Sequence, residues 1–341
     1  MKPAGALRQR AGSGDSGAGP APRKTAHPWW PWLRRVLTFA SFALVAVFSI
    51  RYARTVDWGE VWAAITGTPA QVLLAAAALA AASHALYSCF DLLGRHYTGH
   101  RVPVRRVMGI TFISYAFNLN MGSLVGGVAF RYRLYSHAGL GNAITTRILT
   151  LSMLTNWLGY LVLAGAVFAV APLALPPGWK IDSEGLRWLG LALLAAAALY
   201  VPLCLWSPRR SFNVRGHDIE LPPPRMVAVQ LAMSCTNWMV IGGVIFVLLR
   251  GQLPYVGVLS VLLVAAVAGV ITHVPAGLGV LEAVFVSLLS YRISEGQLLG
   301  ALLTYRALYY IAPLLLASAL YLLLEARTAA KRRGGPKGAS R

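Results

Sequence analysis

The 341-residue chain is 57% hydrophobic, and only 12% of its residues are Asp, Glu, Lys or Arg, about half the charged share of soluble domains. Its polar gaps are short, and its three cysteines lie in apolar runs without metal or redox spacing, which excludes a soluble enzyme and a disulfide scaffold. The net charge of +20 is scattered over loops and tails, so it indicates membrane orientation and contact with anionic lipid, not nucleic-acid binding.

The order of apolar and polar segments predicts an all-α polytopic membrane protein. Residues 1–32 form a basic tail that we expect to be disordered, and the apolar stretch 36–50 predicts a retained signal-anchor helix. Residues 326–341 form a second basic tail. A single membrane domain over 33–325, with about 7–8 transmembrane helices, is expected between the tails. Its uninterrupted spans are predicted at 70–93, 148–171, 187–206, 226–249 and 298–324.

Two further apolar regions are interrupted by residues that break helices. Residues 107–130 carry no charge, and residues 254–291 carry Glu282 as their one formal charge. Backbone that leaves a helix inside hydrocarbon exposes unpaired amide and carbonyl groups unless protein or water satisfies them. The breaks therefore predict a buried or water-lined site. The interrupting residues are Asn118, Asn120, Gly122, Gly126 and Gly127 in the first region, and Pro275, Gly277 and Gly279 in the second.

Loop charges indicate how these regions cross the membrane. Segments 1–35, 94–106, 207–225 and 326–341 hold seven, four, four and six Lys or Arg, so the positive-inside rule places them and both termini in the cytoplasm. Because both loops are cytoplasmic, the chain must cross the membrane an even number of times between 94–106 and 207–225, yet three apolar regions lie between them. We therefore expect 107–130, the interrupted one, to enter and leave on the cytoplasmic side as a broken hairpin. An ordinary spanning helix with polar spots is the alternative, because 24 uncharged residues are long enough to cross.

The same reasoning applied downstream predicts an inverted repeat. Residues 70–171 are predicted to form a helix, a broken hairpin and a helix. Residues 226–325 are predicted to repeat this order in the opposite membrane orientation. Inverted repeats with breaks at matching positions are typical of secondary transporters, whose substrate site lies where the breaks meet. Half-helix N-termini at such breaks favour anions, and a lipid phosphate is one. Helix packing by Gly122 and Gly126, and a simple kink at Pro275, are the alternatives.

Several ionisable residues lie inside apolar runs. Glu282 follows the second break, and Arg306 lies within the last span beside Tyr309, so these residues form either a structural ion pair or part of a transport site. Arg131, four residues after Gly127, could bind a lipid phosphate at the cytoplasmic mouth or extend as an interface arginine. We expect Asp91 to pair with Arg95 at i+4.

Two interrupted segments, Asn118 to Arg131 and Val274 to Glu282, together with Tyr305 to Pro313, resemble the signatures of the lysylphosphatidylglycerol synthase transmembrane-region family. The resemblance covers about residues 35–325. It implies a multi-pass, flippase-like protein of the bacterial inner membrane, in which Arg131, Glu282 and Arg306 are the positions that carry function. In two-part members this region moves an aminoacylated lipid between leaflets, while a soluble domain makes the lipid.

We therefore expect a transporter that moves a phospholipid or a lipid-linked amphiphile, with no enzyme activity, cofactor or metal. Membrane lipids, including anionic phospholipid, are the expected partners, with a homo-oligomer or a lipid-modifying enzyme as further candidates. Two other functions remain open. The chain could carry a small soluble anion, or it could be a non-transporting membrane subunit of a lipid-modifying enzyme. The expected site residues are Arg131, Glu282, Arg306, Asn118, Asn120, Gly126, Gly127, Pro275, Gly277, Gly279 and Tyr309.

Overall fold

The computed structural model describes residues 54, 56–171, 183–206, 211–214, 217–220, 223–272, 274 and 277–333. The chain divides into two units, Met1–Thr55 and Val56–Arg341, and the second holds nearly all the described residues. The expected N-terminal tail and signal-anchor helix lie outside the described residues, as do Pro275 and the end of the C-terminal tail.

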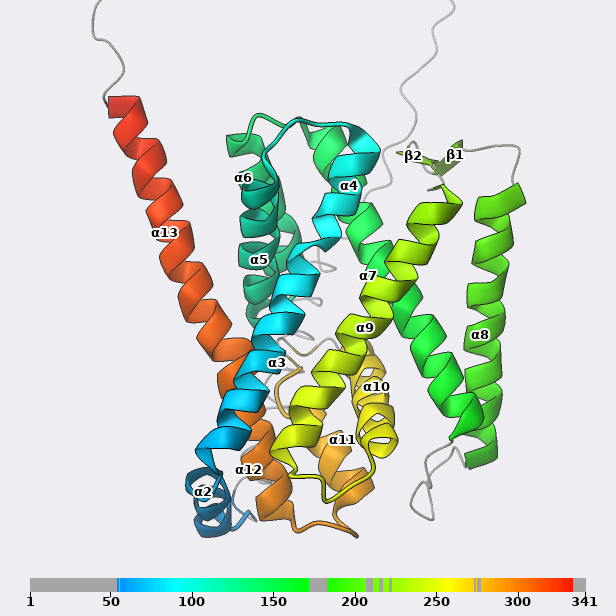
Figure 1. The fold of residues 1–341 in the computed structure, drawn as a ribbon, viewed down its shortest axis with the longest axis vertical. Coiled ribbons are helices and arrows are strands. Elements are labelled where there is room, and N and C mark those ends of the chain that lie inside the picture. Colours follow the sequence, from blue (N-terminus) through cyan, green and yellow to red (C-terminus); the bar gives the residue numbers. More distant parts are fainter. Residues whose placement is uncertain are drawn as a thin grey trace, which may run out of the picture. The chain divides into compact units, whose positions relative to one another are not determined.

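The described part is helical apart from one small hairpin, which confirms the all-α prediction (Figure 1). That hairpin pairs β1 (Ser211–Val214) with β2 (His217–Glu220) in antiparallel register. The helices are α2 (Trp58–Thr66), α3 (Ala70–Ser88), α4 (Phe90–Thr98), α5 (Val104–Met121), α6 (Phe130–His137), α7 (Asn142–Val170), α8 (Ser183–Trp206), α9 (Pro224–Leu248), α10 (Tyr255–Thr272), α11 (Val280–Leu289), α12 (Glu295–Arg306) and α13 (Ala312–Arg333), with π-helical turns η1 (Ser123–Ala129) and η3 (Ala307–Ile311).

Five helical stretches of the described residues are long and apolar enough to cross a membrane. The first joins α3 and α4, and the last joins α12, η3 and α13 into one span that reaches Arg327. Helix α5 of the first interrupted region is not among the five, whereas α10 of the second is, and α8, which covers the span expected at 187–206, is not among them either. The stretches are Ala70–Thr98, Asn142–Val170, Arg225–Leu248, Tyr255–Thr272 and Glu295–Arg327.

The two interrupted regions form hairpins that approach each other from opposite ends of this unit. Helices α5 and α6 lie in the upper half of Figure 1, and α10 and α11 lie in the lower half. In each hairpin the chain turns back at the break, so it does not run through to the other end. The expected hairpin at 107–130 is therefore present, and a single straight helix over these residues is not. The membrane orientation and the repeat halves 70–171 and 226–325 remain predictions.

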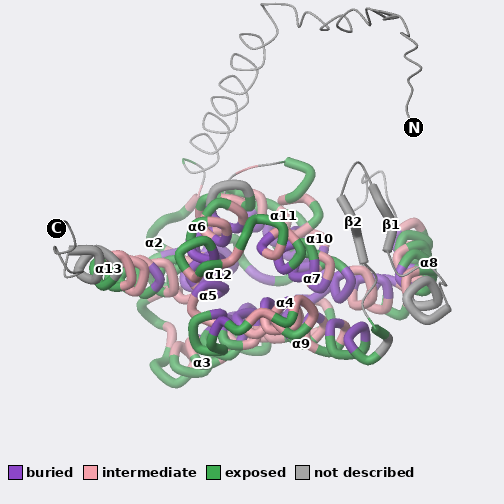
Figure 2. The backbone as a smooth tube through the Cα atoms, turned by 90° about the horizontal axis from the view of Figure 1, so that it is seen from above, coloured by how far each residue is buried: buried purple, intermediate pink, exposed green. Residues whose placement is uncertain are grey.

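Other helices of the unit pack beside the hairpins. Viewed from above, α3, α4 and α9 lie on one side, while α5, α6, α10, α11 and α12 lie on the other (Figure 2). Small residues let some helices approach closely, as is common for helices in membranes. A Cβ added to Gly159 of α7 would lie 2.2 Å from the Ser234 side chain of α9, so glycine is required at this crossing.

Candidate functional site

The first hairpin turns on three glycines, one required by its backbone conformation and two by close packing. Gly122 ends α5 with φ of 83°, a conformation that favours glycine. A Cβ on Gly126 would lie 2.2 Å from the backbone nitrogen of Asn118, and one on Gly127 would lie 2.9 Å from the Asn118 side chain. The double glycine therefore lets η1 pack directly on the end of α5.

Asn120 connects this turn to the last span. Its Nδ2 donates to the Ala116 carbonyl at 2.8 Å and to the Tyr310 carbonyl of η3 at 3.2 Å. Met121, the next residue, is 50% exposed. The tip of the first hairpin is thus held against the last span and is open to its surroundings.

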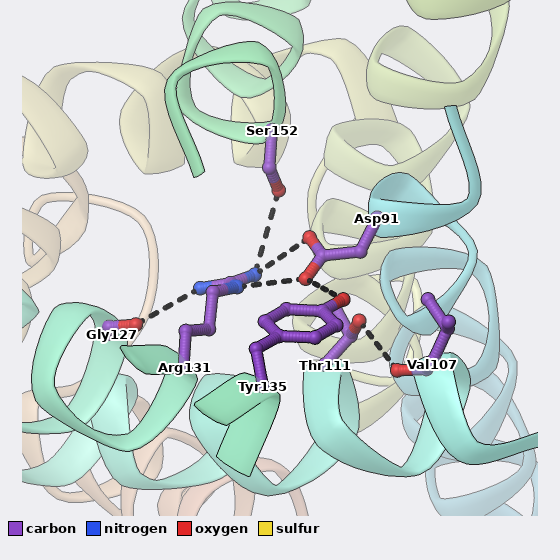
Figure 3. Close-up of polar contacts among 7 residues, drawn as sticks. All are labelled: Asp91, Val107, Thr111, Gly127, Arg131, Tyr135 and Ser152. Atoms are coloured by element: carbon purple, nitrogen blue, oxygen red, sulfur yellow. Dashed lines mark hydrogen bonds and ion pairs between the residues drawn. The ribbon is translucent and has the colours of Figure 1, made fainter. Parts of the chain in front are cut away.

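The returning arm of the first hairpin carries a buried ion pair. Arg131 of α6 donates from Nε to Asp91 Oδ2 at 3.0 Å and from Nη2 to Oδ1 at 3.2 Å (Figure 3). Tyr135 donates to the same carboxylate at 2.9 Å. The remaining contacts of the guanidinium are with the Gly127 carbonyl at 3.3 Å and Ser152 Oγ at 3.5 Å. The exposed fractions of the Arg131 and Asp91 side chains are 4% and 0%.

This pair corrects two expectations. The Asp91–Arg95 pair is wrong, because Arg95 Nε donates to the Val102 carbonyl at 2.8 Å while Asp91 faces the buried Arg131. A buried guanidinium needs a counter-charge more than a partly exposed one does, since its desolvation is otherwise uncompensated. Arg131 is also not an interface arginine extended to water. Neighbouring Arg133 is 57% exposed and pairs with Glu325 at 3.1 Å.

The second hairpin breaks at two glycines in left-handed conformations. Gly277 has φ of 54° and Gly279 has φ of 77°. Gly279 directly precedes α11, so the chain turns sharply just before the returning arm. Leu278 between them is 57% exposed. This tip, like the first, is open to its surroundings.

The returning arm of the second hairpin also carries a buried charge. The Arg306 guanidinium of α12 donates from Nε to Glu282 Oε1 and from Nη2 to Oε2, the latter at 3.0 Å. Nη2 also donates to the Gly277 carbonyl at 2.8 Å, and the guanidinium lies 5.2 Å from the centre of the Tyr310 ring. The Glu282–Arg306 ion pair, which the sequence left undecided, therefore forms, and Arg306 also binds the backbone of the second break. Each of its side chains is 10% exposed, more than in the Asp91–Arg131 pair.

Residues 305–310, which we call the junction segment, contact both hairpins. Arg306 binds the second break, and the Tyr310 carbonyl binds Asn120 of the first. The Tyr309 hydroxyl lies 3.0 Å from that of Tyr115 on α5. The π-helical turn η3 helps to place these side chains, because the wider turn changes which residues face inward.

Sequence reasoning selected Tyr309 but missed its partners. The Tyr309 hydroxyl lies 2.7 Å from Ser83 Oγ, which donates to Asn237 Oδ1 at 2.8 Å. This hydrogen-bonded chain joins α5, η3, α3 and α9, and all its side chains are buried. Ser83 and Asn237 are polar residues inside apolar spans, and that signal could have found them. Within the described residues, no group of three or more His, Cys, Asp or Glu could hold a metal ion.

Comparison with known proteins identifies the family. The model for the lysylphosphatidylglycerol synthase TM region matches residues 36–317. The chain belongs to this family. It is 46% identical over 303 residues to inner membrane protein YbhN of Escherichia coli, covering 89% of this chain and 95% of YbhN. It is 30% identical over 292 residues to protein slr0712 of Synechocystis, covering 84% of this chain and 90% of that protein.

Longer relatives contain a similar region as one part. The chain is 24% identical over 242 residues to the phosphatidylglycerol lysyltransferase of Staphylococcus haemolyticus. The matched region covers 68% of this chain and only 27% of the lysyltransferase. The similarity is thus to a minor part of that enzyme. Membrane-spanning helices and the likeness to YbhN support a multi-pass location in a bacterial inner membrane.

Proposed function

We propose that this protein is a flippase-like transporter that moves a phospholipid or a lipid-linked amphiphile between the two leaflets. One observation carries the proposal. The junction segment contacts the breaks of two hairpins that approach from opposite ends, and each hairpin brings a buried charge paired with its opposite. Paired breaks at matching places are typical of transporters that expose one site to alternate sides of the membrane.

The chemistry of the breaks suits an anionic headgroup. Backbone amides at half-helix N-termini attract negative charge. Arg306 adds a planar guanidinium, a group that binds phosphate with two parallel hydrogen bonds, once its contacts with Glu282 and the Gly277 carbonyl open. Its pair with Glu282 is slightly exposed, whereas the Arg131 pair is closed. Arg306 is therefore the arginine that we expect to meet the headgroup first, while the acyl chains stay in the surrounding lipid.

The proposal predicts lipid movement by the purified protein alone. Proteoliposomes carrying fluorescent phospholipid in both leaflets are treated with an impermeant quencher, and the quenched fraction reports lipid that reaches the outer leaflet. We expect wild-type protein to raise this fraction and Arg306→Ala to abolish the increase. Arg133→Ala is the matched control, because Arg133 is exposed and lies outside both buried pairs.

The same vesicles separate the alternative functions. Uptake of a radiolabelled soluble anion without lipid movement would favour a small-anion transporter. The absence of both activities would contradict the proposal. Lipid modification that appears only with a copurified enzyme would then favour a membrane subunit, a function suggested by the occurrence of a similar region within longer lysyltransferases.

A further inference from the structure

The two buried carboxylates of the core are poorly placed to carry a proton during transport. Asp91 accepts hydrogen bonds from Arg131 and Tyr135, and both oxygens of Glu282 accept from Arg306. Protonation of either carboxylate would disrupt a pair of charge-assisted bonds and leave a guanidinium buried without its counter-charge. A proton-binding group with an available lone pair would avoid this cost.

His84 on α3 offers such a lone pair. The residue is 3% exposed, and its Nδ1 lies 3.0 Å from the Ala80 carbonyl. A carbonyl only accepts hydrogen bonds, so Nδ1 carries the ring proton and Nε2 is left as an acceptor. Nε2 is buried and has no hydrogen-bond partner among the residues that the structure describes. An unsatisfied buried acceptor is costly and calls for a physical explanation.

Aromatic side chains surround His84, and their attraction for a cation would offset part of the cost of burying a positive ring. Its ring centre lies 4.7 Å from that of Tyr309, 5.3 Å from that of Tyr115 and 6.0 Å from that of Phe112. Aromatic rings at such distances attract cations through their electron-rich faces. The imidazole of α3 therefore faces α5 and η3, beside the hydrogen-bonded chain of Tyr115, Tyr309 and Ser83 that joins these elements.

Within the described part of the chain, the elements around His84 bring no unpaired charge of either sign to it. Tyr115 on α5 and Tyr309 on η3 are its titratable ring neighbours, and Tyr87 lies one turn further along α3. Helix α9 contributes uncharged Asn237, while its Cys235 donates to Gly159 of α7. The charged residues further along are Asp91 and Arg131, which are already paired.

We infer that Nε2 of His84 is a proton-binding site within the bundle and that its occupancy is coupled to the lipid transport proposed above, on which the coupling part rests. Binding adds one proton from water to the Nε2 lone pair, and no other covalent bond changes. The acceptor becomes a donor beside Tyr309, whose hydroxyl is already engaged by Ser83 and Tyr115. A new hydrogen bond from Nε2–H to this hydroxyl would compete with those contacts, and it would link the charge on α3 to the first hairpin and the junction segment.

The first test does not depend on transport. The protein with ¹⁵N-labelled histidine is titrated by NMR in detergent micelles, and the His84 signal among the seven histidines is assigned by its loss in His84→Gln. We expect this signal to titrate reversibly between about pH 5 and pH 8. Tyr309→Phe keeps the ring but removes the hydroxyl, so the titration midpoint should move to lower pH. A His84 signal that stays neutral throughout this range would overturn the inference, and Tyr309→Phe provides a second readout if His84→Gln does not fold.

The second test measures coupling. Lipid movement in proteoliposomes is followed from pH 5.5 to pH 8 for wild type, His84→Gln and the exposed control His96→Gln. We expect the wild type and the control to share one pH profile and His84→Gln to lose it. An unchanged profile in His84→Gln would refute the coupling. A titrating His84 in a protein that moves no lipid would refute the proposed transport and leave the proton site standing.

Discussion

The Arg131 guanidinium and the Asp91 carboxylate are bound face to face by two hydrogen bonds, 40 residues apart in the chain and closed to solvent. The pair joins the returning arm of the first hairpin to the first span. It therefore fixes the position of the hairpin relative to the helix beside it.

Removing one member of this pair should be strongly destabilising. We expect Asp91→Asn to lower the free energy of unfolding by about 3–5 kcal/mol, because it leaves a buried guanidinium without its counter-charge. The double variant Asp91→Asn, Arg131→Gln should recover part of this loss. Glu325→Gln, at the exposed pair with Arg133, should lower the free energy of unfolding far less, because exposed ion pairs contribute little. Denaturant unfolding in micelles provides the measurement, and equal losses at the two carboxylates would contradict the burial argument.

The turn of the first hairpin should tolerate no side chain at Gly126. Gly126→Ala forces a methyl group against the backbone of Phe117 and Asn118, so we expect a loss of about 1–3 kcal/mol. Gly109→Ala on α5 is the matched control, since its methyl group would meet nothing within 4 Å. That control should be neutral or stabilising by up to about 1 kcal/mol, because alanine favours helix. Thermal unfolding of both variants tests the difference, and similar melting temperatures would contradict the close approach.

Transport should need the shape of Arg306 as well as its charge. Arg306→Lys keeps a positive charge but loses the paired contacts with Glu282 and the Gly277 carbonyl. The loss of one or two charge-assisted hydrogen bonds predicts a roughly 10- to 100-fold lower initial rate of lipid movement. Arg133→Lys should leave the rate within about twofold of wild type, since exposed ion pairs contribute little. If Arg306→Lys transports at the wild-type rate, the bidentate geometry has no role.

The stability of the protein should depend on pH through His100, in the loop between α4 and α5. Burial, and then the nearby charge of Arg95, lower the pKa of His100 from its ordinary value of 6.5. The folded state therefore favours neutral imidazole, whose Nδ1 accepts from the Val102 backbone N–H at 3.3 Å. The unfolded chain binds the proton more readily, so stability is present above about pH 6.5 and is lost as the pH falls below it.

The variant His100→Asn isolates this effect. Asparagine keeps an acceptor for the Val102 N–H and removes the titration, so we expect it to reduce the loss of melting temperature between pH 7.5 and pH 5.5. Any contribution from His84 is common to both proteins and cancels. If the melting temperatures of wild type and His100→Asn changed with pH in parallel, the lowered pKa of His100 would be contradicted.

Membrane orientation can be tested with single cysteines. In a protein without Cys89, Cys204 and Cys235, we expect Tyr291→Cys to react with an impermeant thiol reagent added to intact cells. Ser136→Cys should react only after the cytoplasmic side is opened. Both positions are exposed, and they lie at the ends of the two returning arms. Labelling of both from the outside would contradict the opposed hairpins and the cytoplasmic termini.

Much of the fold could be predicted from the sequence, because the bilayer imposes simple rules on length and charge. Uncharged runs located four of the five candidate spans, and the fifth, Tyr255–Thr272, falls in the second interrupted region. Glycines located both turns, since Gly122, Gly277 and Gly279 adopt backbone conformations that favour glycine. Loop charges placed both ends of the first hairpin on one side. The functional roles of the selected site residues remain predictions.

Pairing between distant helices could not be predicted in the same way. Asp91 had a nearby basic residue at i+4, and local spacing favoured it. The actual partner, Arg131, comes from another helix, and only the packed bundle shows that its side chain is buried. The hydrogen-bonded chain from Tyr115 to Asn237 likewise forms only because side chains of α5, η3, α3 and α9 come together in the packed bundle. Such contacts follow from tertiary packing and leave only weak traces in one sequence.

The buried charges have an electrical consequence. Asp91, Arg131, Glu282 and Arg306, which are the buried Asp, Glu and Arg side chains among the described residues, have charges that sum to zero. A pair that moves as a unit carries no net charge, so the membrane voltage does no work on it. When a separated arginine or carboxylate moves across the whole membrane field, its free energy changes by about 2.3 kcal/mol per 100 mV. The sensitivity of the protein to voltage therefore reports whether its ion pairs open or travel together.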